Sequence, residues 1–212
     1  MYKLIRKDFL DQNQKCIFCS SPLSTGVAYF LEDKSKNKIV YAGKTCCKKE
    51  LKIDNFNEIP DFTRFKKTSK DATHHNLHLK YENIEDIKNK TSRKKTALEY
   101  LLLREEILEI PNLKYHVLTD IYAISKIREL ESSEIEHIIN IEKNAPKKLK
   151  LFNLLKVYSY LYHLKIALTY EPNNRFLNDV KNHLIKYSEL SDKQTDAINK
   201  TLKNHNSLSL IK

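Results

Sequence analysis

Three cysteines near the start of the chain constrain its fold more than any other feature. Cys16 and Cys19 are separated by two residues, and Cys46 follows 27 residues after Cys19. A tight turn in a C-x-x-C motif points both sulfur atoms at one ion, and a structural zinc ion takes four such ligands in a tetrahedron. In a reducing compartment this spacing indicates metal binding more often than a disulfide. The cysteines therefore predict a zinc-binding module at the N-terminal end.

The residues between the second and third cysteines have the pattern of a β-hairpin. Residues 27–31 and 39–42 are runs of β-branched and aromatic residues, and the polar tract 32–38 between them has the composition of a turn. A glycine ends the second run, and residues 44–53 are expected to form a short helix. Cys46 then lies in the first turn of that helix, where the helix dipole and unpaired N–H groups favour a thiolate. A cysteine knuckle, a hairpin and a ligand at a helix start are the layout of a treble-clef zinc finger.

The sequence leaves the fourth zinc ligand open. Cys47 directly follows Cys46, and neighbouring residues bind the same ion only where the backbone bends between them. A treble clef usually spaces its second ligand pair by two residues, but position 49 is a lysine. The alternative is a histidine from a cluster farther along the chain, which consists of His74, His75 and His78. Cys47 is favoured over this cluster, so the predicted metal ligands are Cys16, Cys19, Cys46 and Cys47.

The cysteine-containing stretch resembles a zinc-binding module of phage and plasmid proteins. The pattern is C-x-x-C-x-x-x-L, then a hairpin, then aromatic-x-G-x-x-C-x-K, and it covers residues 14–53 here. The matching residues are Cys16, Cys19, Leu23, Tyr41, Gly43, Cys46 and Lys48. The segment SELSDKQTDAINKTL, residues 188–202, also resembles a helical S-x-K-Q element of mobile-element proteins. These resemblances imply a setting in phage or plasmid biology, and they imply no definite activity.

Positive charge is concentrated in the first half of the chain. The net charge is +11, and residues 1–97 carry 21 Lys and Arg against 12 Asp and Glu, whereas residues 98–212 carry 17 against 15. Such an excess is expected of a surface that faces a polyanion, although a coding bias toward lysine, asparagine and isoleucine would also produce it. The predicted nucleic-acid contacts are Lys44, Lys48, Lys49, Lys66, Lys67, Arg93, Lys94 and Lys95. Candidates for stacking on bases are Phe62, Phe65 and Tyr81.

Composition divides the chain into three predicted parts. Residues 1–57 form the zinc-binding module, whose first fifteen residues are expected to be a lead-in with one helical turn. Residues 58–95 are rich in Lys and Arg and poor in large aliphatic residues, so they are expected to be a loosely structured basic connector. Residues 96–212 have apolar residues at spacings of three and four and are expected to form a helical domain.

Two features organise the predicted helical domain. Residues 147–170 are apolar on more than one face and are expected to form the central buried helix. Residues 117–143 and 176–202 share a pattern that is consistent with a duplicated pair of short helices joined by a tight turn. In the second copy, Ser191 and Gln194 form an S-x-x-Q capping box. The cap expected in the first copy is a serine, Ser132 or Ser133.

Several classes of function are disfavoured by what the sequence lacks. It has only 2 glycines and no GxGxxG or GxxxxGK[ST] motif, so a nucleotide-binding enzyme of a common type is not expected. The predicted hairpin contains no histidine, which disfavours a His/Asn metal-dependent nuclease. The sequence has no stretch of about 18 apolar residues that could span a membrane, and it has no signal-peptide pattern, so a cytoplasmic protein is expected.

The sequence therefore predicts a mainly α protein in which a small treble-clef-like zinc module, a β-hairpin plus a short helix, precedes a helical bundle. The expected function is that of a zinc-stabilised nucleic-acid-binding accessory protein of a mobile element, and not that of an enzyme. The alternative is a protein-interaction factor, such as a phage-encoded inhibitor or adaptor that acts on a host complex. The expected partners are thus a nucleic acid, DNA or RNA, or a protein, and no membrane.

Overall fold

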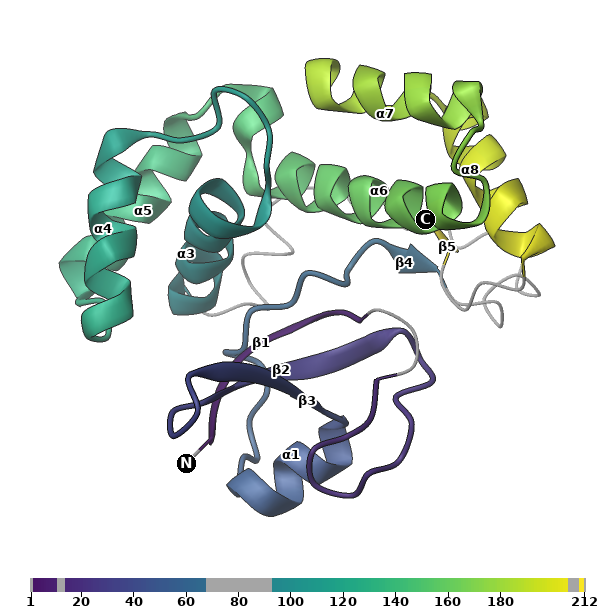
Figure 1. The fold of residues 1–212 in the computed structure, drawn as a ribbon. Helices are drawn as coiled ribbons and strands as arrows, with labels where there is room; N and C mark the ends of the chain where they lie inside the picture. Colours follow the sequence, from purple (N-terminus) through teal and green to yellow (C-terminus); the bar gives the residue numbers. More distant parts are fainter. Residues whose placement is uncertain (1, 11–13, 68–92, 206–209, 212) are drawn as a thin grey trace.

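The structure, a computed structural model, describes residues 2–10, 14–67, 93–205 and 210–211 (Figure 1). Within them the chain is mainly helical, with seven α-helices and a small antiparallel sheet at the N-terminal end. The sheet and one short helix form the N-terminal module at the bottom of Figure 1, and the other helices form the helical part above it. The predicted mainly α class is confirmed. Within the described ranges, no helix combines the length and the apolar character that a membrane span requires.

The N-terminal sheet contains the predicted hairpin. Strands β2 (Val27–Asp33) and β3 (Lys38–Ala42) pair antiparallel, with Asp33 opposite Lys38 at the turn. Asp33 Oδ1 accepts hydrogen bonds from the backbone N–H (3.0 Å) and from the hydroxyl (2.6 Å) of Ser35. An aspartate with such bonds to its own loop favours a turn over a continued strand. The prediction of a hairpin is therefore confirmed together with its local cause.

The prediction of a helical turn near the N-terminus is wrong. Residues Tyr2–Phe9 form strand β1, which pairs antiparallel with β2 and completes a sheet of order β1-β2-β3. Tyr2 and Leu4 pack against the core of the N-terminal module, and Phe9 is buried. The partner strand β2 is separated from β1 by the loop that carries Cys16 and Cys19, and strand formation depends on such partners more than on local propensity. No local signal therefore marks this strand.

The N-terminal module has a small apolar core of its own. Helix α1 (Lys44–Leu51) lies against the sheet. It confirms the short helix predicted over residues 44–53. It ends at Lys52, whose φ of 54° places it in the left-handed conformation that commonly terminates helices. The buried residues between α1 and the sheet, called the N-terminal core below, are Cys16, Tyr29, Leu31, Val40, Ala42 and Cys47.

The prediction of a loosely structured connector is wrong for residues 60–67. The backbone N–H of Lys7 in β1 donates to the carbonyl of Pro60 (2.8 Å), and the N–H of Phe62 donates back to the carbonyl of Lys7 (3.1 Å). Phe62 and Phe65 are buried in the core of the helical part. Two aromatic side chains thus fix a segment whose average composition is polar. The remainder of the predicted connector that precedes Arg93 lies outside the described residues.

Within the described residues, six helices make up the helical part. A π-helical turn, η2 (Leu103–Ile107), continues the first of them, and a 3-10 turn, η3 (Lys147–Leu149), precedes the fourth. A short strand, β4 (Lys66–Lys67), pairs with β5 (Leu210–Ile211) beside these helices. The six helices are α3 (Arg93–Leu102), α4 (His116–Ile127), α5 (Ser132–Asn144), α6 (Leu151–Tyr170), α7 (Arg175–Tyr187) and α8 (Asp192–Asn204).

Helix α6 is the central helix of this part, as predicted. Leu154, Leu164 and Ala167 on it are almost fully buried, and α7, α8 and β5 all pack against it. It ends at Glu171, directly before Pro172, because proline cannot continue a helix. The predicted stop at this dipeptide is confirmed.

The two predicted helix pairs are present, and each has a four-residue connection and a capping box on its second helix. Helices α4 and α5 are joined by residues 128–131 and lie beside α3, whereas α7 and α8 are joined by residues 188–191 and pack on α6. In the second pair, Gln194 Oε1 accepts from the Ser191 backbone N–H (2.8 Å), which confirms that capping box. In the first pair the capping residue is Glu131, not Ser132 or Ser133, and the Glu134 carboxylate accepts from its backbone N–H (2.7 Å). The two turns differ in conformation, since α4 ends at an extended residue, Arg128, and α7 ends at Ser188 in the left-handed conformation.

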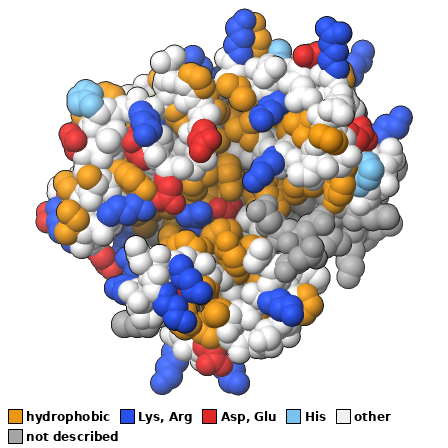
Figure 2. Space-filling view, in the orientation of Figure 1, with side chains coloured by type: hydrophobic (Ala, Val, Ile, Leu, Met, Phe, Trp, Pro, Cys, Tyr) orange, Lys and Arg blue, Asp and Glu red, His pale blue; other side chains and the backbone are white. Residues whose placement is uncertain are grey.

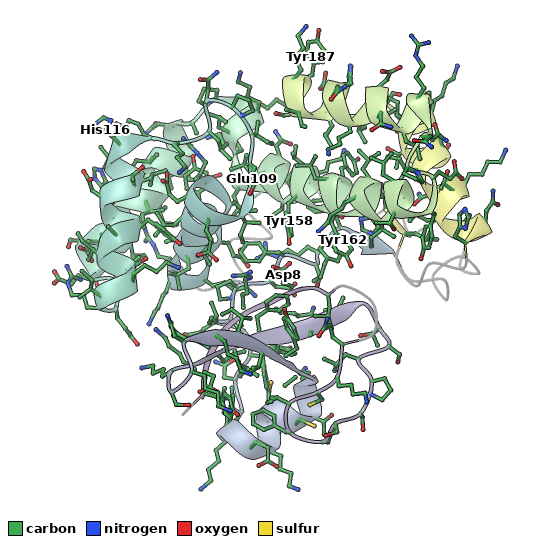
Figure 3. The ribbon with its side chains drawn as sticks, viewed as in Figure 1. Asp8, Glu109, His116, Tyr158, Tyr162 and Tyr187 are labelled. Carbon is green, nitrogen blue, oxygen red and sulfur yellow. The ribbon has the colours of Figure 1, made fainter. Side chains whose placement is uncertain are left out.

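The N-terminal module meets the helical part where Asp8 of β1 faces tyrosines of α6 (Figure 3). Asp8 Oδ1 accepts hydrogen bonds from the Tyr158 hydroxyl (2.7 Å) and the Phe9 backbone N–H (2.8 Å), and Oδ2 accepts from Arg6 (2.9 Å). Tyr162 stacks on Phe9 with the ring centroids 4.3 Å apart. Burial raises the pKa of Asp8, although Arg6 and these donors oppose the shift. A buried, hydrogen-bonded carboxylate and stacked rings together fix the sheet against α6.

Glu99 of α3, which is buried, makes a second contact, between the helical part and the segment that follows the N-terminal module. Its side chain has 0% exposure, accepts a hydrogen bond from the Asp61 backbone N–H (2.8 Å) and forms an ion pair with Arg64. Burial raises the pKa of Glu99, and the adjacent Arg64 guanidinium opposes this shift. The Glu99 carboxylate thus binds the backbone of Asp61 and the side chain of Arg64, both in the segment that precedes the helical part.

The ion pair of the Asp61 side chain with Lys7 of β1 is expected to be sensitive to acid. Burial alone would raise its pKa, but the Lys7 ammonium (2.9 Å) and two bonds from Thr63 bring the pKa below the usual range. A carboxyl with a lowered folded-state pKa contributes stability above the unfolded pKa of about 4, and that stability is lost as pH falls through the folded pKa.

We therefore expect the free energy of unfolding to fall more steeply with acid below about pH 4 in the wild type than in Asp61→Asn. Urea unfolding at several pH values measures this difference. The Asp54→Asn variant is a suitable control, because the Asp54 side chain is 88% exposed. Identical pH profiles for wild type and Asp61→Asn would contradict the assignment.

Candidate metal centre

The structure brings three of the predicted metal ligands together. The sulfur atoms of Cys16, Cys19 and Cys46 all lie within 4.8 Å of one another, and those of Cys19 and Cys46 are 3.5 Å apart. Zn–S bonds of about 2.3 Å in a tetrahedron place two sulfur ligands about 3.8 Å apart. The spacing of these three thiols, called the cysteine cluster below, therefore suits a single metal ion.

A tight loop positions the first two cysteines. The backbone N–H of Cys16 donates to the carbonyl of Ser21 (2.9 Å), and the N–H of Ser20 donates to the carbonyl of Cys16 (2.9 Å). Ser20 has a φ of 59°, a left-handed conformation that reverses the chain within the loop. The N–H of Ile17 donates to the carbonyl of Tyr41 in β3 (2.8 Å), so the loop is attached to the sheet. These bonds explain why two cysteines on a short loop point the same way.

The three thiols influence one another electrostatically. Hydrogen bonds from Ser21, and then from Cys46 and Cys16, lower the pKa of Cys19 to about 7. The thiol of Cys46 donates to Cys19, and this bond and the nearby sulfur charges raise the pKa of Cys46 to about 12. Of these two thiols, Cys19 is therefore the one that ionises more readily. A bound dication would favour ionisation of all three thiols, because metal binding displaces protons from its ligands.

Cys47 is not part of this group. Its side chain is fully buried in the N-terminal core, and burial is the main reason that its pKa is raised to about 12. Neighbouring residues on an α-helix point about 100° apart, so Cys46 faces the cluster while Cys47 faces the core. The alternative ligands His74, His75 and His78 lie outside the described residues.

The predicted nucleic-acid contacts lie on three elements, α1, α3 and β4. Lys44, Lys48 and Lys49 lie exposed on α1, next to the cysteine cluster. At the start of α3, by contrast, Arg93 and Lys94 pair with acidic residues of the helical part, and Lys95 is partly buried. Burial also lowers the pKa of Lys95. Lys66 and Lys67 lie in β4, and their side chains are outside what the structure describes.

The proposed role of two aromatic residues is wrong. Phe62 and Phe65 were candidates for stacking on bases, but their exposures are 0% and 7% because they pack in the core of the helical part. Phe65 meets the ring of Phe152 on α6 at a centroid distance of 5.1 Å. Tyr81, the third candidate, lies outside the described residues.

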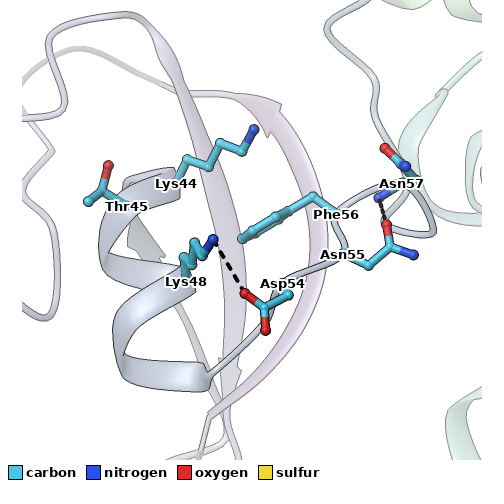
Figure 4. A pocket seen from close by; sticks show the side chains of 7 residues that line it. All are labelled: Lys44, Thr45, Lys48, Asp54, Asn55, Phe56 and Asn57. Atoms are coloured by element: carbon cyan, nitrogen blue, oxygen red, sulfur yellow. Dashed lines mark hydrogen bonds and ion pairs between the residues drawn. The ribbon is translucent and has the colours of Figure 1, made fainter.

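The sequence interpretation missed a pocket beside α1 (Figure 4). The pocket has a volume of about 400 Å³, and it lies between α1 and the loop that follows the helix. Its described lining residues are Lys44, Thr45, Lys48, Asp54, Asn55, Phe56 and Asn57. The sequence predicts no site at residues 54–57, because all of them except Phe56 are ordinary polar residues. The one local signal was Phe56, an aromatic residue in a polar tract.

The fold and the site define a mainly helical protein with an N-terminal antiparallel sheet and a three-cysteine cluster that could bind a metal ion. Comparisons with known proteins add no family to this class: no family model, no curated protein and no solved structure matches the chain.

Proposed function

We propose that the protein is a nucleic-acid-binding accessory protein whose N-terminal module is stabilised by zinc in a treble-clef-like arrangement. The observation that carries this proposal is the position of Cys46 on the same short helix as Lys44, Lys48 and Lys49. A metal ion held by the cysteine cluster fixes α1, and α1 presents the lysines to solvent. The resemblance of this stretch to modules of phage and plasmid proteins supports a setting in a mobile element.

Zinc is the metal that best suits the donor set. Three thiolates are soft ligands, and in proteins they select zinc, copper(I) or iron–sulfur clusters over hard cations. A cysteine on a tight loop and a cysteine at a helix start are also common in structural zinc sites. The cysteine cluster supplies three ligands, and a water molecule or a side chain from outside the cluster completes the tetrahedron.

The exposed lysines support a polyanionic partner. The side chains of Lys48 and Lys49 are 62% and 84% exposed, so phosphate groups can reach them. Figure 2 shows Lys and Arg side chains on the N-terminal module at the bottom of the view and also over the helical part above it. Such contacts to phosphate oxygens supply affinity without sequence preference.

A salt titration tests the proposal. We expect fluorescent single-stranded and duplex oligonucleotides to bind with an affinity that falls steeply with salt, because each phosphate contact contributes about 0.7 to the logarithmic slope on single strands and about 0.9 on duplex DNA. The double variant Lys48→Ala/Lys49→Ala should lower the slope by roughly 1. The double variant Arg93→Ala/Lys94→Ala removes the same charge and should change the slope less, because both residues lie on α3 in the helical part and not on α1.

Two results would contradict this function. One is the absence of binding to any DNA or RNA at low salt by protein with full metal content. The other is an equal effect of the two double variants, which would show that α1 is not the contact surface.

A second candidate function is binding of a protein partner. Phe176 and Tyr187 on α7 are each 50% exposed, and Ile127 at the end of α4 is 87% exposed. Figure 3 shows Tyr187 pointing away from the helical part at the end of α7. A complex with a host protein that survives high salt and nuclease treatment, and that is lost in Phe176→Ser/Tyr187→Ser, would favour this function over nucleic-acid binding.

A further inference from the structure

The pocket beside α1 has the composition of a site for a polar, anionic ligand. Six of its seven described lining residues are polar, whereas sites for apolar small molecules are lined mainly by hydrophobic side chains. Lys44 and Lys48 come from one face of α1, since they are four residues apart. Asp54 is the single acidic residue in the lining, so the two ammonium groups leave the pocket with a net positive charge.

The acidic residue does not block an anion. Lys48 Nζ lies 3.3 Å from Asp54 Oδ1, but both side chains are well exposed, at 62% and 88%. An exposed ion pair of this kind contributes little to stability. A phosphate group can therefore replace Asp54 as the partner of Lys48 while the aspartate turns toward solvent.

Phe56 gives the pocket an aromatic surface, and its ring packs against the N-terminal core. Its ring meets that of Tyr29, a residue of the N-terminal core, at a centroid distance of 5.0 Å and an interplanar angle of 62°. Figure 4 shows the ring between the side chains of Lys44 and Lys48, and Lys44 Nζ lies 5.5 Å from the ring centroid. A half-buried aromatic side chain between two cations is the arrangement with which proteins hold an unpaired base and its phosphate.

The loop adds groups that suit the edge of a base. Asn55 Oδ1 accepts a hydrogen bond from the backbone N–H of Asn57 (2.9 Å), which orients the Asn55 amide. Both asparagines line the pocket, so their amides add hydrogen-bond donors and acceptors to its wall. The volume of about 400 Å³ lies within the range of about 300 to 1,000 Å³ that ligand sites occupy.

We infer that this pocket binds one nucleotide of a single-stranded nucleic acid, with a backbone phosphate between Lys44 and Lys48 and a base against Phe56. The inference rests on the proposed nucleic-acid binding and specifies the form of its ligand. A single strand is required because a base within a duplex is stacked on its neighbours and cannot reach a protein ring.

Adjacent lysines on α1 allow a matched test. The variants Lys48→Ala and Lys49→Ala remove the same charge one residue apart, but only Lys48 lines the pocket. With a labelled oligothymidylate as the probe, we expect Lys48→Ala to lower the salt slope by about 0.7 and Lys49→Ala to change it by less than half of that. Phe56→Leu keeps an apolar side chain against Tyr29 but removes the aromatic face, and it should weaken binding to the single strand about fivefold or more. Its binding to a duplex of the same length should stay within about twofold.

The outcomes separate this inference from the proposed function. Metal content and thermal unfolding must match the wild type in each variant, and Phe56→Tyr, which keeps an aromatic face, should restore binding. If wild-type protein binds the single strand but Lys48→Ala and Lys49→Ala are equivalent and Phe56→Leu has no effect, the pocket inference is overturned while nucleic-acid binding stands. An equal loss of duplex binding in Phe56→Leu also overturns it. If wild-type protein binds no nucleic acid, both proposals fail.

Discussion

Replacing Cys19 or Cys46 by serine is expected to remove the bound metal and to unfold much of the N-terminal module. The N-terminal core contains six buried residues, and two of them are cysteines. Apolar cores of this size seldom stabilise a fold without a metal or a disulfide. Structural zinc contributes about 10 to 16 kcal/mol of apparent free energy in zinc-finger peptides, so its loss far exceeds any local packing energy.

Metal analysis and hydrogen exchange measure this result. Metal per chain should fall from about one to near zero, and protection of amides in β2, β3 and α1 should fall with it, because the binding energy of a structural ion is folding energy. Cys47→Ala is the matched control, since its thiol lies in the core and outside the cysteine cluster. That variant should keep its metal. Full metal content in Cys19→Ser, or its loss in Cys47→Ala alone, would contradict the assignment of the ligands.

Replacing Glu99 by alanine should destabilise the helical part by about 3 to 5 kcal/mol, because removal of one partner leaves the other charge of a buried ion pair uncompensated. The change also removes the acceptor for the Asp61 backbone N–H. Glu99 has 0% exposure and Arg64 has 21%, so water can only partly replace the lost carboxylate.

Urea unfolding at neutral pH measures the loss, with Glu129→Ala as the control. Glu129 also pairs with a cation, Lys94 (2.9 Å), but its side chain is 80% exposed. An exposed pair contributes about 0 to 1 kcal/mol, so the control should stay close to the wild type. Similar midpoints for the two variants would show that the Arg64–Glu99 pair is not a stabilising contact of the folded chain.

Local signals in the sequence predict much of the fold. Helix α8 begins at Ser191 because the serine and Gln194 satisfy each other's backbone donors, and α6 ends before Pro172. Both causes lie within a few residues of the boundary they determine. The hairpin likewise depends on its own turn, through the bonds that Asp33 accepts.

What the sequence does not predict depends on residues far apart in the chain. Strand β1 forms because β2 offers an edge, and residues 60–67 are ordered because two phenylalanines reach the helical core. The same holds for the candidate site. The pattern predicts Cys16, Cys19 and Cys46 as a group, but which of two adjacent cysteines faces the core depends on how α1 lies against the sheet. The ion pair of Arg93 cannot be predicted from its neighbours in the sequence, because its partner Glu136 lies on another helix, α5.

The position of Phe62 and Phe65 bears on how the protein can be divided. Both precede the helices, yet both are part of the helical core. A fragment that begins at residue 96 would lack them and would expose the apolar surface of α6 that they cover, which favours aggregation. A fragment that begins at residue 58 would keep both side chains but would lose β1, to which this segment is hydrogen-bonded. Neither of the boundaries predicted from composition, before residue 58 or before residue 96, therefore separates two independently stable parts of the chain.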